Sequence, residues 1–162
     1  MYEAHAGAVK AYALRRGAAT DAEDVVAEVF LAAWRRLSDV PEDARGWLLG
    51  AARRVQSNAR RGAARRQALR EALEHERPPD HTVPRSADQR LVAALLGLEE
   101  DDREALLLIA WEGLSYREAA TVLGLRESAF GVRLHRARGR LANALRDDGP
   151  PSSEIPTRIE VR

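Results

Sequence analysis

The chain has 162 residues, a formal net charge of +1 at pH 7 and no cysteine, which excludes a disulfide framework, a thiolate metal site and a cysteine nucleophile. No apolar run approaches the ~20 residues of a membrane span, and Met1 leads into a helical pattern without a signal peptide, so we expect a cytoplasmic protein with no membrane insertion. Ala, Leu, Arg and Glu dominate, and only 5% of residues are aromatic, which predicts an all-α fold.

The charge is distributed in blocks along the chain. Residues 21–43 hold seven acids against two arginines, a net of −5, whereas residues 45–70 hold eight arginines and no acid. The segment 99–104 is acidic again, and the last long helix is basic. This alternation predicts two kinds of partner surface, one that meets a basic partner and one that meets a polyanion.

The first clear element is a helix that Thr20 or Asp21 caps and that reaches Leu37. Its expected core face consists of Val26, Phe30, Ala33 and Leu37. On another face, three acids fall within about 60° of one another at 100° per residue: Asp21, Asp24 and Glu28. Complementarity with the helix dipole explains the acids of the first turn but not Glu28, so the stripe is a candidate partner surface.

A loop over residues 38–46 precedes a helix predicted for residues 47–61. Its apolar side is formed by Leu48, Ala51, Ala52, Val55 and Ala59. Polar and basic residues cover the opposite side: Arg53, Arg54, Ser57, Asn58, Arg60 and Arg61. Trp47 lies at the edge, where an indole can pack in a core or stack on a base. A basic helix beside an aromatic residue is typical of a surface that binds single-stranded nucleic acid.

Composition divides the chain into two small helical domains. The first domain covers residues 1–73, and the proline-rich, apolar-poor stretch 74–86 reads as a flexible linker. The second domain covers residues 87–146 and is expected to hold four helices. Residues 147–162 begin with Asp147-Asp148-Gly149-Pro150 and are expected to be a disordered tail.

The second domain ends in a helix-turn-helix pattern. Ser115 and Glu118 form a capping box, and Gly124 suits the positive φ that stops a short helix and starts another at a steep angle. The second helix, residues 127–146, carries an apolar stripe of Phe130, Leu134, Ala137, Leu141 and Leu145. A strip about 100° away is basic and contains Arg126, Ser128, Ala129, Arg133, Arg136 and Arg140. An ordinary helical hairpin is the alternative, but a nearly single-signed strip is typical of phosphate contact.

These segments, in this order, resemble the extracytoplasmic-function (ECF) group of bacterial RNA polymerase sigma factors. Residues 21–37 resemble conserved region 2.2, residues 47–61 resemble regions 2.3 and 2.4, and residues 102–106, 113–120 and 133–138 resemble region 4. The resemblance implies a transcription initiation factor that binds core polymerase, opens the −10 promoter element with region 2 and reads the −35 element with region 4.

The resemblance also implies a role for each candidate surface. The stripe Asp21, Asp24 and Glu28 corresponds to the surface that docks on the β′ clamp helices, and the loop 38–46 to the one that captures a flipped −10 base. Residues 47–61 correspond to the surface that holds the non-template strand, and residues 126–140 to the −35 reader. Core polymerase, including its β flap, promoter DNA and an anti-sigma factor are the partners that it implies. Many relatives carry Asn where Arg54 stands, and Gly131 replaces a basic contact in the recognition helix.

Three other functions are weighed against this one. An enzyme is disfavoured because the sequence shows no phosphate loop, metal-ligand spacing or nucleophile signature, and we expect no cofactor or metal. A response-regulator-type transcription factor can carry a similar helix-turn-helix, but residues 1–73 contain no apolar strand run for a receiver domain. The third alternative is an interaction module that occupies polymerase without binding DNA.

Overall fold

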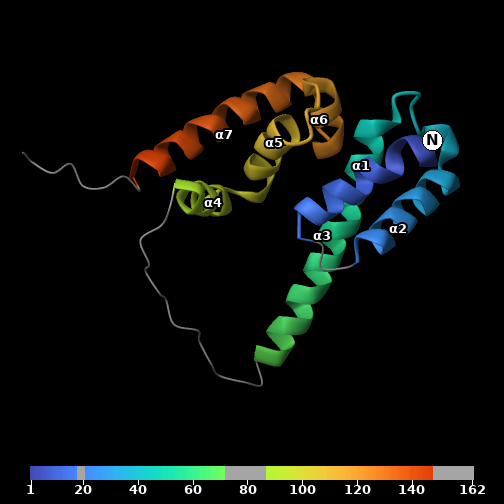
Figure 1. Ribbon diagram of the computed structural model, residues 1–162, viewed down its shortest axis with the longest axis horizontal. Helices are drawn as coiled ribbons and strands as arrows, with labels where there is room; N and C mark the ends of the chain where they lie inside the picture. The colour runs from blue at the N-terminus through green and yellow to red at the C-terminus, as the bar shows by residue number, and fades with distance from the viewer. Residues whose placement is uncertain (18–20, 72–86, 148–162) are drawn as a thin grey trace, which may run out of the picture.

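The computed structural model describes residues 1–17, 21–71 and 87–147, and over these residues it is entirely helical, as predicted. The elements are α1 (Tyr2–Arg15), α2 (Ala22–Arg35), a 3₁₀ turn η1 (Leu37–Asp39), α3 (Ala44–Glu71), α4 (Ala87–Gly97), α5 (Glu100–Ala110), α6 (Tyr116–Leu123) and α7 (Glu127–Asp147). Helices α1–α3 form an N-terminal half and α4–α7 a C-terminal half, and the second part of α3 extends away from both (Figure 1). The predicted linker 74–86 and nearly all of the predicted tail lie outside the described residues.

Helix α2 begins where the capping residue predicts and ends earlier than expected. The Asp21 side chain accepts a hydrogen bond of 3.0 Å from the backbone N–H of Glu23, so Asp21 is the N-cap. The helix ends at Arg35 instead of reaching Leu37, which starts the 3₁₀ turn and is 58% exposed. The prediction that Leu37 belongs to the core is therefore wrong. The buried face consists of Ala22, Val25, Val26, Val29 and Ala33.

Helix α3 is longer at both ends than the predicted 47–61. It begins at Ala44, so the last three residues of the predicted loop 38–46 belong to the helix, and it continues to Glu71. Its apolar side is buried as predicted, at Leu48, Ala51 and Ala52. The sequence around Trp47 was taken as the start because it opens the apolar pattern, but the alanine and arginine before it also favour helix.

The helix-turn-helix forms as the sequence predicts. The Ser115 hydroxyl accepts from the Glu118 backbone N–H, and the Glu118 carboxylate accepts from the Ser115 N–H at 2.8 Å. Burial raises the pKa of Glu118, but these bonds and the nearby Arg45 outweigh it and leave that pKa below its usual value. Gly124 has φ 67°, and the Leu125 N–H bonds to the Ala120 carbonyl, which closes the helix end in a Schellman arrangement.

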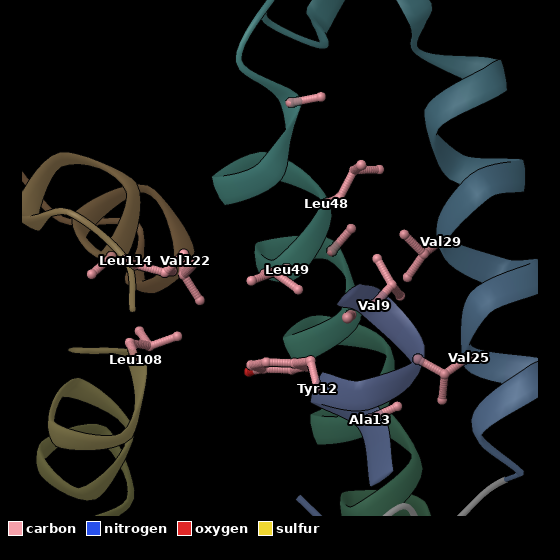
Figure 2. Packing of buried hydrophobic residues seen from close by; sticks show 14 of the residues in the cluster. Val9, Tyr12, Ala13, Val25, Val29, Leu48, Leu49, Leu108, Leu114 and Val122 are labelled. Carbon is pink, nitrogen blue, oxygen red and sulfur yellow. The ribbon is translucent and has the colours of Figure 1, made fainter. Parts of the chain in front are cut away.

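The two halves share one hydrophobic core. The buried cluster continues from residues of α1–α3 to Ala105, Leu108, Leu114, Val122 and Phe130 of the C-terminal half. Figure 2 shows Leu48 on the α2 side of α3, whereas Leu49 and the Tyr12 ring point toward Leu108 and Val122. Helix α3 therefore buries two sides, one within its own half and one against the other half.

Two glycines bring α3 against the backbone of α6. A Cβ at Gly46 would come within 3.1 Å of the Glu118 carbonyl oxygen, and one at Gly50 would lie 3.4 Å from the Val122 Cα. The glycines are four residues apart, so they lie on one face of α3. This contact between halves was not predicted from the sequence.

Candidate polymerase and nucleic-acid interfaces

The predicted polymerase surface lies along the exposed side of α2. Asp24 and Glu28 are exposed, and Asp21 is exposed at the N-cap. Leu31 lies about 20° from Asp24 around the helix axis and is 48% exposed. Trp34 is one helical step further and is 77% exposed. Exposed apolar side chains beside acids indicate a surface that a protein partner covers.

Leu31, Trp34 and Leu37 were not among the predicted site residues. The sequence offers a signal for them, because the apolar residues of α2 outnumber the positions of a single buried face. We define Asp24, Glu28, Leu31 and Trp34 as the α2 surface.

The predicted −10 surface of α3 divides into two strips. Arg53, Ser57 and Arg60 are half-buried on the side that faces α5, and Arg54, Asn58 and Arg61 are exposed on the adjacent side. The exposed strip is braced along the helix, because Arg61 donates to the Ser57 hydroxyl at 3.0 Å and to the Asn58 side-chain oxygen at 2.6 Å. Trp47 is half-buried and packs against the core cluster, and it also lines a hollow of 430 Å³ together with Pro41, Glu42 and Asp43.

The predicted −35 strip lies on one side of α7. Arg126, Ser128, Ala129, Arg136 and Arg140 are exposed, and Arg133 is half-buried. The strip borders a hollow of 380 Å³ whose opposite wall includes Glu99 and Asp102 of α5. The apolar stripe of the same helix is buried at Phe130, Leu134 and Ala137, as predicted. A T-shaped contact of 5.6 Å between the Tyr116 and Phe130 rings fixes α6 on α7.

An acidic segment touches both basic surfaces. We define the acidic turn as Glu99, Glu100, Asp101 and Asp102, where α5 begins. Arg53 and Arg60 of α3 pair with Asp101 and Glu100, respectively. The second oxygen of the Asp101 carboxylate lies 2.9 Å from an Arg133 guanidinium nitrogen, and Arg140 pairs with Asp102. One carboxylate, that of Asp101, thus bridges the two predicted DNA-binding helices.

A buried network of charges joins α1 to the C-terminal half. Arg16 donates to Glu104 at 3.1 Å and to Glu112 at 2.5 Å, and its guanidinium lies 4.1 Å from the centre of the Tyr12 ring. The Tyr12 hydroxyl donates to Glu104 at 2.7 Å, and burial, together with that carboxylate, raises the pKa of Tyr12. Burial lowers the pKa of Arg16, but Glu104 outweighs this effect and leaves it raised. All four groups are therefore held in fixed charge states.

Two other kinds of site were searched for in the described ranges. Residues 1–17, 21–71 and 87–147 contain no group of three or more His, Cys, Asp or Glu side chains that could hold a metal ion. In the same ranges, every helix is too short or too polar to cross a membrane.

Comparison with known families identifies both halves. The family model "Sigma-70 region 2" matches residues 1–66, which cover α1, α2 and most of α3. The model "Sigma-70, region 4" matches residues 88–141, which cover α4 to α6 and most of α7. The helix-turn-helix and the basic strip of α7 thus belong to the region 4 match, and α2 and the basic strips of α3 to the region 2 match.

Relatives with similar sequences are ECF sigma factors. The chain is 34% identical to SigL of Mycobacterium tuberculosis, over 92% of this chain and 89% of SigL, and 34% identical to CnrH of Cupriavidus metallidurans, over 80% and 75%. Among solved structures, RpoE of Bartonella quintana bound to the anti-sigma factor NepR matches with a TM-score of 0.61 at 26% identity, over 91% of this chain and 96% of RpoE. CnrH bound to the cytosolic domain of CnrY matches with a TM-score of 0.60 at 31% identity, over 91% and 86%. The chain therefore belongs to the ECF sigma factors, transcription initiation factors that bind core RNA polymerase and direct it to promoter DNA.

Proposed function

We propose that this sigma factor works through three surfaces: the α2 surface docks on the β′ clamp helices, the basic strips of α3 hold the opened −10 element, and α7 reads the −35 element. The observation that carries the proposal is that each half presents a basic helical face and that only the N-terminal half adds an acidic and apolar one. The protein supplies binding and specificity in the cytoplasm, and the chemistry belongs to the polymerase.

The docking surface is the first to test. Single exposed ion pairs contribute only ~0–1 kcal/mol, so two reversed charges are needed for a clear effect. Asp24→Arg with Glu28→Arg should weaken binding to core polymerase about tenfold or more, measured by titration of labelled sigma factor. As a control, Glu3→Arg with Asp88→Arg makes the same charge change at exposed positions of α1 and α4. An affinity equal to that of this control would rule out the docking assignment.

The −10 assignment rests on the position of Trp47 above the strips of α3. Pro41, Glu42, Asp43 and Trp47 surround a hollow at the end of the loop, and arginines follow along the helix. Flipping a base costs a few kcal/mol of stacking, which a pocket and phosphate contacts must offset. A hollow beside a basic helix provides both kinds of contact for a single strand.

For the −35 element, we expect Arg133 to read a base and Arg140 to contact phosphate. The N-terminal part of a recognition helix normally enters the major groove, and a guanidinium there can bond guanine O6 and N7. Arg133→Ala should cost about 1–3 kcal/mol on the cognate −35 element and relax one base position, whereas Arg140→Ala should weaken all sequences about equally. Binding of single-base variants of the element measures both. A uniform loss with Arg133→Ala would make that residue a backbone contact.

Two further partners follow from the C-terminal half and from the relatives. An apolar cleft of 230 Å³ lies between α4, α5 and α7 and is lined mostly by leucines, with Ile109 and the 56%-exposed Trp111 at its side. We propose that this cleft receives the β flap of the polymerase. Because RpoE and CnrH are solved with anti-sigma proteins, an anti-sigma factor is proposed as the regulatory partner of this chain as well.

A further inference from the structure

The contact between the two halves occupies the arginines that the proposed function assigns to DNA. Arg53 and Arg60 of the −10 surface pair with Asp101 and Glu100, and Arg133 of the −35 surface pairs with the same Asp101. We propose that the free protein is held in a closed conformation in which the acidic turn of α5 takes the place of DNA phosphate. This inference rests on the proposed function, because it names the regulation of the same two surfaces.

Promoter geometry requires the closed conformation to open. The −10 and −35 elements are about 25 base pairs apart, which is about 85 Å of duplex at 3.4 Å per base pair. In the closed conformation, Arg53 and Arg133 contact the two oxygens of a single carboxylate. The two surfaces cannot reach both elements at once while Asp101 bridges them. DNA phosphates and the acidic turn therefore compete for the same guanidinium groups.

The acidic turn does not hold the halves together by itself. Leu49 packs toward Leu108 and Val122, and Gly50 lets α3 approach α6 closely (Figure 2). Arg45 also donates to the backbone carbonyl of Glu112 at 2.7 Å. Apolar contact thus supplies non-directional attraction, and the ion pairs set which basic residues are covered.

Two variants loosen the closed conformation by independent routes. Asp101→Asn removes the bridging charge, and Asp88→Asn is its matched control, since both are aspartates in the first turns of neighbouring helices. Gly50→Leu adds a side chain where the three nearest atoms all belong to α6, without any change of charge. Its control is Gly7→Leu, at an exposed helical glycine beyond whose Cβ position nothing lies within 4 Å.

Binding to DNA by the free protein is the first measurement. The probe is a labelled duplex of mixed sequence, about 20 base pairs long, so that no promoter need be known. Without polymerase, Asp101→Asn should bind three- to tenfold more tightly than Asp88→Asn at low salt, with a difference that shrinks as salt rises. Gly50→Leu should exceed Gly7→Leu by a similar factor.

Distance between the halves is the second measurement. The chain has no cysteine, so dyes can be attached specifically at Ala4→Cys on α1 and Ala142→Cys on α7, both exposed positions. Energy transfer should be high in the free wild type and lower in Gly50→Leu. Equal transfer in both proteins, or DNA affinities of Asp101→Asn and Gly50→Leu no higher than those of their controls, would overturn the inference.

Addition of core polymerase separates this inference from the proposed function. Binding of core to the labelled wild type should lower the energy transfer, because the polymerase holds the two halves apart. If core does not bind, the proposed function fails, but the measurements on the free protein still decide whether the closed conformation exists. If core binds and free-protein variants equal their controls, the function stands and the inference fails.

Discussion

At the scale of residues, the least expected feature is a pair of buried carboxylates. The Glu104 and Glu112 side chains are 9% and 3% exposed, and they meet the guanidinium of Arg16, which is 6% exposed. Removing one partner of such a buried pair leaves an uncompensated charge, which costs far more than the pair itself contributes. The sequence shows these residues only as ordinary helix-end charges, because their burial depends on contact between halves that are 88 or more positions apart.

Arg16→Ala should therefore lower the free energy of unfolding by about 3–5 kcal/mol, since both glutamates lose a buried partner. Urea denaturation followed by circular dichroism measures this change. The control is Lys10→Ala, which breaks the exposed pair with Glu23 on the same helix and should leave the midpoint nearly unchanged. If the two variants unfolded at the same urea concentration, the network around Arg16 would contribute nothing to stability.

At the scale of elements, local signals predicted best where they act within a few residues. The capping box, the left-handed Gly124 and the stripe of α7 all depend on neighbouring positions, and the structure has each of them. The end of α2 and both ends of α3 were misplaced, because alanine- and arginine-rich sequence favours helix without marking its limits. The second buried side of α3 was missed because its small residue, Gly50, reads as a weak point in a helix rather than as a contact.

The candidate sites follow the same division. The positions on α2, α3 and α7 were predicted from helical spacing, and most of these side chains are exposed. What spacing cannot give is the partner of each arginine. Asp101 lies 48 residues from Arg53 and was noted only as part of an acidic stretch. Tertiary contact decides that this stretch faces the basic strips.

At the scale of the whole molecule, the small net charge of +1 follows from blocks of opposite sign. The closed conformation brings the acidic turn against the basic strips, which lowers the repulsion within each strip and reduces the positive field that steers DNA. A shared core then couples the folding of the two halves. Residues of α1 such as Val9 and Ala13 and residues of α5 such as Ala105 and Leu108 belong to one buried cluster.

Native-state hydrogen exchange tests this coupling. In the wild type, the slowest amides of α1 and α5 should exchange with similar free energies of opening, because each half loses core contacts when the other leaves. Gly50→Leu separates α3 from α6, so the two sets should then exchange with different free energies, and Gly7→Leu should retain the wild-type pattern. Different opening energies already in the wild type would show that the halves fold independently, and that the core they share adds contact without cooperativity.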